Sequence, residues 1–367
     1  MPHKPTYIIA EAGVNHNGCM DRAKALIHAA AEAGVDTVKF QTFSADHLVT
    51  KNAAKAHYQQ KQTGSDENQY EMLKKLELSH EQHHMLKAEC DTVGITFFST
   101  SFDDPSLTFL AEDMNLPFFK IPSGEITNAP SILQHARYGR PIILSTGMST
   151  LMDIEEALGI IAFGYMGHKT PPGREEFHAA YTSDQGKALL KERVTLLHCT
   201  SEYPAPLDSI NLKAMDTMRD TFGLKVGYSD HSMGITVPIA AVARGASIIE
   251  KHFTLDRSLP GPDHEASLQP YELKAMTLAI REIELALGDG IKAPQAGESN
   301  TACVARKSLH AATSISKGQP ITSDNLAIMR PASGISPIDY WDIIGKKSSK
   351  DYTQGESIIV EDFNNDE

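Results

Sequence analysis

Two lysines occupy positions in this sequence where a charged side chain is uncommon. Lys39 and Lys120 lie inside the apolar stretches VKFQTF (38–43) and FKIPSGE (119–125). An unpaired charge is costly in apolar surroundings, so each lysine needs an anionic partner. A salt bridge to Glu11 or Glu125 is the structural alternative. The functional ones are a clamp for phosphate and carboxylate groups or a Schiff-base lysine.

Two histidines also end apolar stretches, His231 in VGYSDHS (226–232) and His252 in EKHF (250–253). Two neutral imidazoles can bind one divalent cation, with water at the open positions. Histidines that only make structural hydrogen bonds remain the alternative. His83 and His84 lie on a helix-like stretch and are predicted to be surface residues.

These residues belong to a regular alternation of strand-like and helix-like segments. The strand-like runs are mostly apolar, as in parallel strands buried on both faces. They cover residues 7–14, 35–43, 95–102, 117–125, 141–148, 194–201, 225–232 and 247–255. Eight strands alternating with helices predict a (β/α)₈ TIM barrel over residues 1–287, and a doubly wound sheet is the alternative.

A barrel gathers the C-terminal ends of its strands at one face, where active sites lie. The polar residues expected there are Glu11, Asn15, His16, Lys39, Gln41, Ser99, Thr100, Ser101, Lys120, Ser123, Glu125, Ser145, Thr146, His198, Thr200, Ser201, Tyr203, Ser229, Asp230, His231, Glu250, Lys251, His252, Asp263 and His264. So many ionisable groups at strand ends indicate a catalytic face.

Three further segments depart from the alternation. Residues 44–78 and 164–193 are predicted to be long polar loops, the first on the catalytic side. Residues 288–302 read as a polar linker. Residues 303–367 show short β-runs and turns, and they predict a small β-rich domain.

Composition narrows the function. The net charge of −13 over 367 residues argues against nucleic acid as a partner, but it allows an anionic small molecule held by a few focused lysines. No apolar run is long enough for a membrane span, and the N-terminal residues lack a signal-peptide core, so a cytoplasmic protein is expected. The four cysteines are far apart, which argues against a zinc site or disulfides.

The ordered motifs of the chain resemble one family, the sialic acid synthases. They are IIAEAGVNHNG, VKFQTF, FKIPSGE, ILSTGM, LLHCTSEYPAP, GYSDHS, EKHFTLD and GPDHEAS, followed by the tail RKSL…ISKGQPITSDNLAIMRPASGIS, which resembles an antifreeze-like (SAF) domain. The resemblance covers nearly the whole chain. It implies a (β/α)₈ barrel joined to a SAF domain in a domain-swapped homodimer.

The resemblance also implies a reaction and a role for each matching residue. Phosphoenolpyruvate condenses with an open-chain N-acetylated amino sugar, giving a nine-carbon 2-keto acid and phosphate. The implied catalytic residues are Glu11, Lys39, Lys120 and Glu125. Those for substrate binding are Gln41, Thr100, Ser123, Ser201, Tyr203, Ser229, Asp263 and Arg330, and those for Mn²⁺ or Mg²⁺ are His231 and His252. Ser201 replaces an Asn that is frequent in relatives, and Arg330 is expected to reach the partner's active site.

The leading hypothesis is an N-acetylneuraminate synthase that uses N-acetylmannosamine. The alternative is a legionaminate or pseudaminate synthase that uses a 2,4-diacetamido-2,4,6-trideoxyhexose. A Schiff-base aldolase, through Lys120 or Lys251, and a non-catalytic sugar- or ice-binding protein are further alternatives. The aldolase alternative predicts trapping of the substrate by borohydride and no need for metal, and the non-catalytic alternative leaves Lys39, Lys120, His231 and His252 unexplained.

Overall fold

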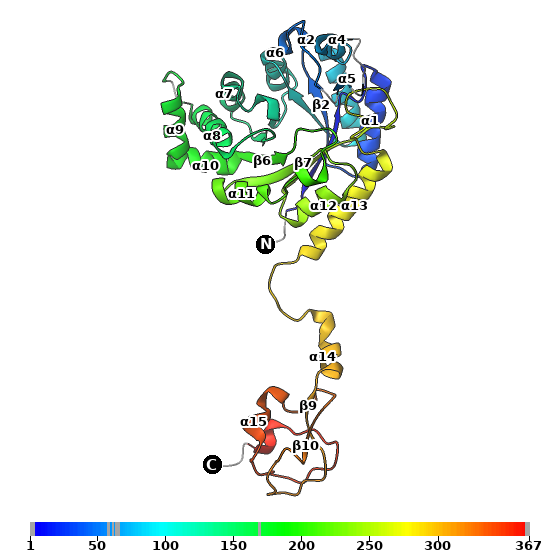
Figure 1. Cartoon of the computed structure of the whole chain (residues 1–367), viewed down its shortest axis with the longest axis vertical. Coiled ribbons are helices and arrows are strands. Elements are labelled where there is room, and N and C mark those ends of the chain that lie inside the picture. Colours follow the sequence, from blue (N-terminus) through cyan, green and yellow to red (C-terminus); the bar gives the residue numbers. More distant parts are fainter. Residues whose placement is uncertain (1–3, 57–58, 61, 63–66, 168–169, 364–367) are drawn as a thin grey trace. The chain divides into compact units, whose positions relative to one another are not determined.

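The computed structural model describes residues 4–56, 59–60, 62, 67–167 and 170–363. The chain divides into two compact units, Met1–Gly288 and Asp289–Glu367. Figure 1 shows the first unit as a ring of helices around a set of strands, and the second as a smaller unit. Within the described ranges, no helix combines the length and the apolar character that crossing a membrane requires.

The first unit contains the eight predicted strands in one parallel sheet. They are β1 (Tyr7–Gly13), β2 (Thr37–Thr42), β3 (Thr96–Ser101), β4 (Phe119–Ile121), β5 (Ile142–Ser145), β6 (Val194–Cys199), β7 (Lys225–Asp230) and β8 (Ile248–His252). Their order is β3-β2-β1-β8-β7-β6-β5-β4. The two edge strands are neighbours, and the rings of Phe98 and Phe118 lie 4.3 Å apart between their centroids at this seam. The predicted TIM barrel is therefore confirmed as a near-closed barrel.

All eight strands are shorter than predicted, and two of them end for clear local reasons. The strand predicted over 117–125 covers only Phe119–Ile121, because Pro122 lacks the N–H that would continue the ladder, and a 3₁₀ turn follows at Ser123–Glu125. The strand predicted over 225–232 ends at Asp230, whose carboxylate accepts hydrogen bonds from the backbone N–H and the hydroxyl of Ser232 and so turns the chain.

Helices follow the strands around the barrel. They are α1 (Met20–Ala33), α2 (Ala45–Leu48), α4 (Gln69–Lys74), α5 (His80–Val93), α6 (Asp104–Thr108), α7 (Ala129–Arg137), α8 (Leu151–Met166), α9 (Arg174–Thr182), α10 (Asp184–Arg193), α11 (Ala214–Phe222), α12 (Thr236–Ala243) and α13 (Pro270–Leu287). Local signals set several ends. The Ser79 side chain caps the start of α5, and Gly34, with φ of 75°, ends α1.

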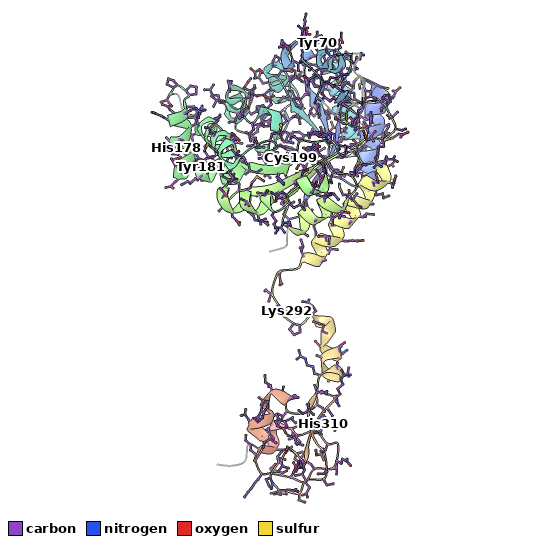
Figure 2. The ribbon with its side chains drawn as sticks, viewed as in Figure 1. Tyr70, His178, Tyr181, Cys199, Lys292 and His310 are labelled. Carbon is purple, nitrogen blue, oxygen red and sulfur yellow. The ribbon has the colours of Figure 1, made fainter. Side chains whose placement is uncertain are left out.

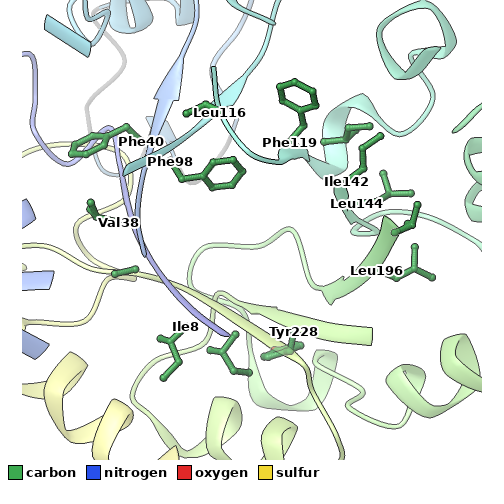
Figure 3. Close-up of a cluster of buried hydrophobic side chains, with 14 of the residues drawn as sticks. Ile8, Val38, Phe40, Phe98, Leu116, Phe119, Ile142, Leu144, Leu196 and Tyr228 are labelled. Carbon is green, nitrogen blue, oxygen red and sulfur yellow. The ribbon is translucent and has the colours of Figure 1, made fainter. Parts of the chain in front are cut away.

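Alternate residues of each strand face outward to the helices or inward to the barrel axis. Ile8, Val38 and Phe40 belong to the large outer core between strands and helices (Figure 3). Four inward residues, Ile9, Ile143, Leu197 and Ile248, form a separate apolar cluster. The residues two positions further along these strands are Glu11, Ser145, Cys199 and Glu250. The apolar cluster thus closes one end of the barrel, and the next inward layer is polar.

Both segments predicted to be long loops contain helices. Residues 164–193 include α9 and α10, and the side chain of Ser183 caps α10. The described part of 44–78 includes α2 and α4, and α4 starts with a capping box between Asn68 and Glu71. The prediction gave weight to the polar composition of these stretches and missed their caps.

The second unit is a small domain with its own core of nine buried apolar residues, including Leu309, Ile321 and Tyr352. Its strands β9 (Ser308–Ala311) and β10 (Leu326–Met329) pair antiparallel. The rest of the described part is mainly turns and short helices, among them α15 (Tyr340–Ile343). The stretch predicted as a linker is partly helical, because α14 spans Ser299–Ala305.

Candidate active site

A cavity of about 510 Å³ opens at the C-terminal ends of the barrel strands. Twelve of the fourteen predicted site residues line it: Glu11, Lys39, Gln41, Thr100, Lys120, Ser123, Ser201, Tyr203, Ser229, His231, His252 and Asp263. They come from seven of the eight strands or from the loops that follow them. The closure of the barrel therefore brings together residues that are up to 252 positions apart.

The floor of the cavity is a compact cluster of two cations and two carboxylates. The Lys120 ammonium donates to both Glu250 oxygens at 2.7 and 2.9 Å. Lys39 Nζ lies 2.7 Å from Glu11 Oε2, 3.4 Å from Glu250 Oε2 and 2.9 Å from Thr100 Oγ1. All four charged side chains are buried. Lys39 thus has the expected partner Glu11, whereas Lys120 is paired with Glu250 and not with Glu125.

The electrostatics of this cluster are set by burial and by its opposite charges. Burial raises the pKa of Glu11, and the adjacent Lys39 only partly offsets this effect. Burial also acts to raise the pKa of Glu250, but Lys120 and Lys39 outweigh it and lower that pKa. The pKa of Lys120 is lowered, mainly because burial disfavours its charged form. Glu250 is therefore a fixed anion, and Glu11 is the carboxylate better suited to exchanging a proton.

Hydroxyl groups surround the lysines. Ser229 Oγ donates to Glu250 Oε1 at 2.8 Å. Ser123 Oγ accepts a hydrogen bond from the Gly147 N–H at 3.0 Å and lies 3.1 Å from Cys199 Sγ, a residue labelled in Figure 2. A Cβ at Gly147 would lie 2.3 Å from Ser201 Oγ and 2.9 Å from Ser123 Oγ, so any larger residue would displace these hydroxyls. Lysines beside several hydroxyls form a pocket suited to an anion that carries phosphate and carboxylate groups.

The two predicted metal-binding histidines face each other beside this cluster. Their ring centroids are 5.8 Å apart, and both side chains are buried. His231 Nδ1 donates to the Thr200 carbonyl oxygen at 2.6 Å, which leaves Nε2 with a free lone pair. The buried Nδ1 of His252 has no hydrogen-bond partner. Burial lowers the pKa of His231 to about 4 and that of His252 well below its usual value, so both rings are neutral at pH 7.

This donor set fits a divalent cation, since neutral imidazoles with free nitrogens are good ligands. Across the described part of the chain, no group of three or more His, Cys, Asp or Glu residues could hold a metal ion. A cation at His231 and His252 would therefore need water or substrate oxygens as its remaining ligands.

A buried ion pair lies behind the histidines. Lys251 Nζ is 2.6 Å from Asp230 Oδ2, and both side chains are fully buried. Asp230 also accepts from Ser232, so this pair fixes the turn that carries His231. Lys251 is not among the residues that line the cavity. Its burial argues against the Schiff-base role considered for it.

The remaining predicted residues lie along the wall of the cavity. Gln41 Nε2 donates to Glu11 Oε1 at 3.3 Å, and the Tyr203 ring packs against His231 at a tilt of 34°, with centroids 4.1 Å apart. Asp263 is buried, and this burial, together with the nearby Glu11, raises its pKa to about 7. The cavity thus has a second carboxyl group that can carry a proton near neutral pH.

Two predicted site residues do not line the cavity. Glu125 is half-buried in the 3₁₀ turn after β4, where it accepts a hydrogen bond from Asn128 Nδ2 at 2.7 Å. Arg330 belongs to the second unit, where it is exposed directly after β10.

Other residues differ from their predicted roles. Glu250 was predicted to lie at the catalytic face but was given no catalytic, substrate-binding or metal role, although its spacing of two from His252 places both on the inward face of β8. His83 was predicted to be on the surface and is instead buried, with Nε2 2.8 Å from Thr42 Oγ1.

Comparison with known proteins identifies the family. The sequence profile of the NeuB family matches residues 26–292, and that of the SAF domain matches residues 306–363. The chain belongs to the NeuB family. The predicted resemblance, the SAF domain and the enzyme class, a phosphoenolpyruvate-dependent transferase that forms carbon–carbon bonds, are thereby confirmed.

Two relatives of this NeuB-family chain are N,N'-diacetyllegionaminic acid synthases. That of Campylobacter jejuni is 47% identical over 97% of this chain and 99% of the relative. That of Legionella pneumophila is 44% identical over 97% of this chain and 94% of the relative. Among solved structures, the N-acetylneuraminic acid synthetase of Leptospira borgpetersenii is 33% identical, with a TM-score of 0.65 over 81% of this chain and 90% of that protein. The first two relatives favour the legionaminate alternative over the leading N-acetylneuraminate hypothesis.

Proposed function

We propose that this enzyme condenses phosphoenolpyruvate with a 2,4-diacetamido-2,4,6-trideoxyhexose to give N,N'-diacetyllegionaminate and inorganic phosphate. The observation that carries the reaction class is the cavity floor, where Lys39 and Lys120 converge on Glu250 beside two neutral histidines. The higher identity to legionaminate synthases than to the N-acetylneuraminic acid synthetase supports this choice of sugar.

Lys39 and Lys120 are placed to hold the phosphate and carboxylate of phosphoenolpyruvate, with the hydroxyls of Thr100, Ser123 and Ser229 as further donors. Glu250 holds the two ammonium groups close together before the substrate arrives. Such preorganised charges stabilise the anionic groups throughout the reaction without reorganisation at the time of chemistry.

The sugar aldehyde must then lie beside His231 and His252. When a divalent cation is bound there, it polarises the aldehyde as a Lewis acid. C3 of phosphoenolpyruvate attacks the aldehyde carbon, the aldehyde oxygen becomes an alkoxide that takes up a proton, and positive charge develops at C2. Water adds at C2, and Glu11, whose pKa is raised, accepts its proton. The tetrahedral intermediate loses phosphate by C–O cleavage, which leaves the 2-keto group.

The test is phosphate release by the purified protein with phosphoenolpyruvate, Mn²⁺ and a panel of sugars. The panel holds N-acetylmannosamine and the trideoxyhexose epimers that lead to legionaminate and pseudaminate. We expect the legionaminate precursor to give the highest kcat/KM, with one phosphate per keto acid. Absence of phosphate with every sugar would contradict the reaction, and a higher kcat/KM for N-acetylmannosamine would contradict the choice of sugar. EDTA treatment followed by Mn²⁺ or Mg²⁺ tests the metal.

We further propose a cytoplasmic homodimer in which Arg330 of one chain completes the cavity of the other. Mixing Arg330→Ala with Lys120→Ala, each inactive alone, tests this arrangement. A swapped heterodimer contains one site with an intact barrel and an intact arginine, so random reassociation restores roughly a quarter of wild-type activity. No recovery after verified subunit exchange would contradict the swap.

A further inference from the structure

The cavity changes in character along β2, from its charged floor towards its outer end. Three inward residues follow one another at intervals of two. Lys39 contacts Glu11 and Glu250, Gln41 contacts Glu11, and Phe43 packs among apolar side chains. The surroundings of these side chains therefore change from charged at Lys39, through the amide of Gln41, to apolar at Phe43, directly after β2.

The apolar end is built mainly by the segment between β2 and α5. We call its cavity-lining side chains the α2–α4 wall: Phe43, Leu48, Met72, Leu73, Leu76 and Phe102. Phe43, Met72 and Leu76 are buried, whereas Leu48, Leu73 and Phe102 are half-buried. The rings of Phe43 and Phe102 meet edge to face, with centroids 6.4 Å apart. These contacts give the wall a packed apolar surface at the edge of a polar site.

The reaction fixes which part of a sugar meets this wall, an argument that rests on the proposed function. The aldehyde must lie beside the histidines and C3 of phosphoenolpyruvate, which occupies the charged floor. The carbons furthest from the aldehyde therefore lie in the rest of the cavity, where the α2–α4 wall is. Gln59 and Gln69 also line this end and carry amide groups that can donate and accept hydrogen bonds.

We propose that the α2–α4 wall is the specificity determinant for the sugar. It receives the 6-methyl group and the methyl of the 4-acetamido group of a 2,4-diacetamido-2,4,6-trideoxyhexose. N-acetylmannosamine carries hydroxyl groups at both C4 and C6, and against this wall they lose water without gaining protein partners. An apolar subsite disfavours an added hydroxyl by about 10- to 100-fold in kcat/KM, and that is the preference we expect.

The variants Leu73→Gln and Leu48→Gln test the proposal. Both residues are half-buried and come from different helices, α4 and α2, so the two changes place an amide in the wall independently. The measured quantity is the ratio of kcat/KM for the trideoxyhexose to that for N-acetylmannosamine. Each variant is expected to lower this ratio by about tenfold and to leave the KM for phosphoenolpyruvate unchanged. Leu278→Gln, at a 56% exposed position on α13, is the matched control and leaves the ratio as in the wild type.

The outcomes separate this inference from the proposed function. A wild-type enzyme that releases phosphate with both sugars at similar kcat/KM overturns the role of the wall and leaves the reaction class standing. A wild-type preference that neither wall variant reduces also overturns it. If no sugar leads to phosphate release, the reaction itself is overturned. A merely structural role for the wall would lower stability and the rates with both sugars equally, without changing their ratio.

Discussion

Replacing Glu250 with glutamine is the sharpest test of the charged floor. The change preserves the shape of the side chain and removes its charge. Glu250 accepts hydrogen bonds from Lys120 and Ser229 and lies 3.4 Å from Lys39, so Glu250→Gln leaves one buried lysine without its partner and another with only Glu11. The expected result is a large loss in the free energy of unfolding.

The magnitude follows from the geometry. At an effective dielectric constant of about 20, charges separated by the observed 2.7 Å attract by roughly 6 kcal/mol, and removal of one partner from a buried pair costs about 3–5 kcal/mol after relaxation. The lysines hold the pKa of Glu250 below its usual value. The ionised Glu250 therefore adds to the free energy of unfolding above pH 4.5, and this stabilisation is lost as the pH falls further. The difference between wild type and variant is therefore largest near neutral pH and narrows in acid.

Urea unfolding at pH 7 and pH 4 measures this difference. Glu156→Gln is the control, because its pair with Arg174 is exposed and is expected to contribute less than about 1 kcal/mol. Inorganic phosphate should raise the Tm of Glu250→Gln more than that of the wild type, since the anion can replace the missing carboxylate between the lysines. The reasoning would be refuted if Glu250→Gln lowered the free energy of unfolding by less than about 1 kcal/mol and if phosphate raised the Tm of variant and wild type equally.

Three further predictions concern the rest of the site. His252→Ala should weaken Mn²⁺ binding by at least about tenfold, measured by isothermal titration calorimetry, and unchanged affinity would contradict the metal assignment. Asp230→Asn should weaken Mn²⁺ binding by about 10- to 100-fold through loss of the turn that holds His231, and a double-mutant cycle with Lys251→Met should show strong coupling. Because the pKa of Asp263 is raised to about 7, the native protein retains a proton that the unfolded chain releases, and this stabilisation is lost as the pH rises through 7. In urea unfolding, the free energy of unfolding of Asp263→Asn relative to that of the wild type should therefore rise by about 2–3 kcal/mol between pH 5 and pH 8. A difference that stays constant over this pH range would refute the pKa shift of Asp263.

The barrel and most of its cavity could be predicted from local sequence pattern. Each strand is an apolar run, and the polar residues at its C-terminal end must face one side of a barrel. This geometry is why Lys39, Lys120, His231 and His252 reach the same cavity. It depends only on strand count and direction, which local patterns determine well.

Pairings across the barrel could not be predicted in the same way. Whether Lys120 meets Glu125 or Glu250 depends on which inward residues lie at the same level after closure, and that is a property of the strand stagger. The α2–α4 wall was missed for a different reason. Its apolar residues, such as Leu48 and Leu73, are few within a mostly polar segment, and they gain a common surface only when the two helices pack together.

The contact between Lys120 and Glu250 joins β4 to the last strand of the barrel, 130 residues later in the chain. Until β8 has been synthesised, Lys39 has Glu11 as a partner, but Lys120 lacks the carboxylate that accepts its hydrogen bonds. A chain that ends before β8 therefore lacks the Glu250 carboxylate that pairs with Lys120 on the cavity floor. The charged floor of the cavity is therefore complete only in a chain that contains all eight strands.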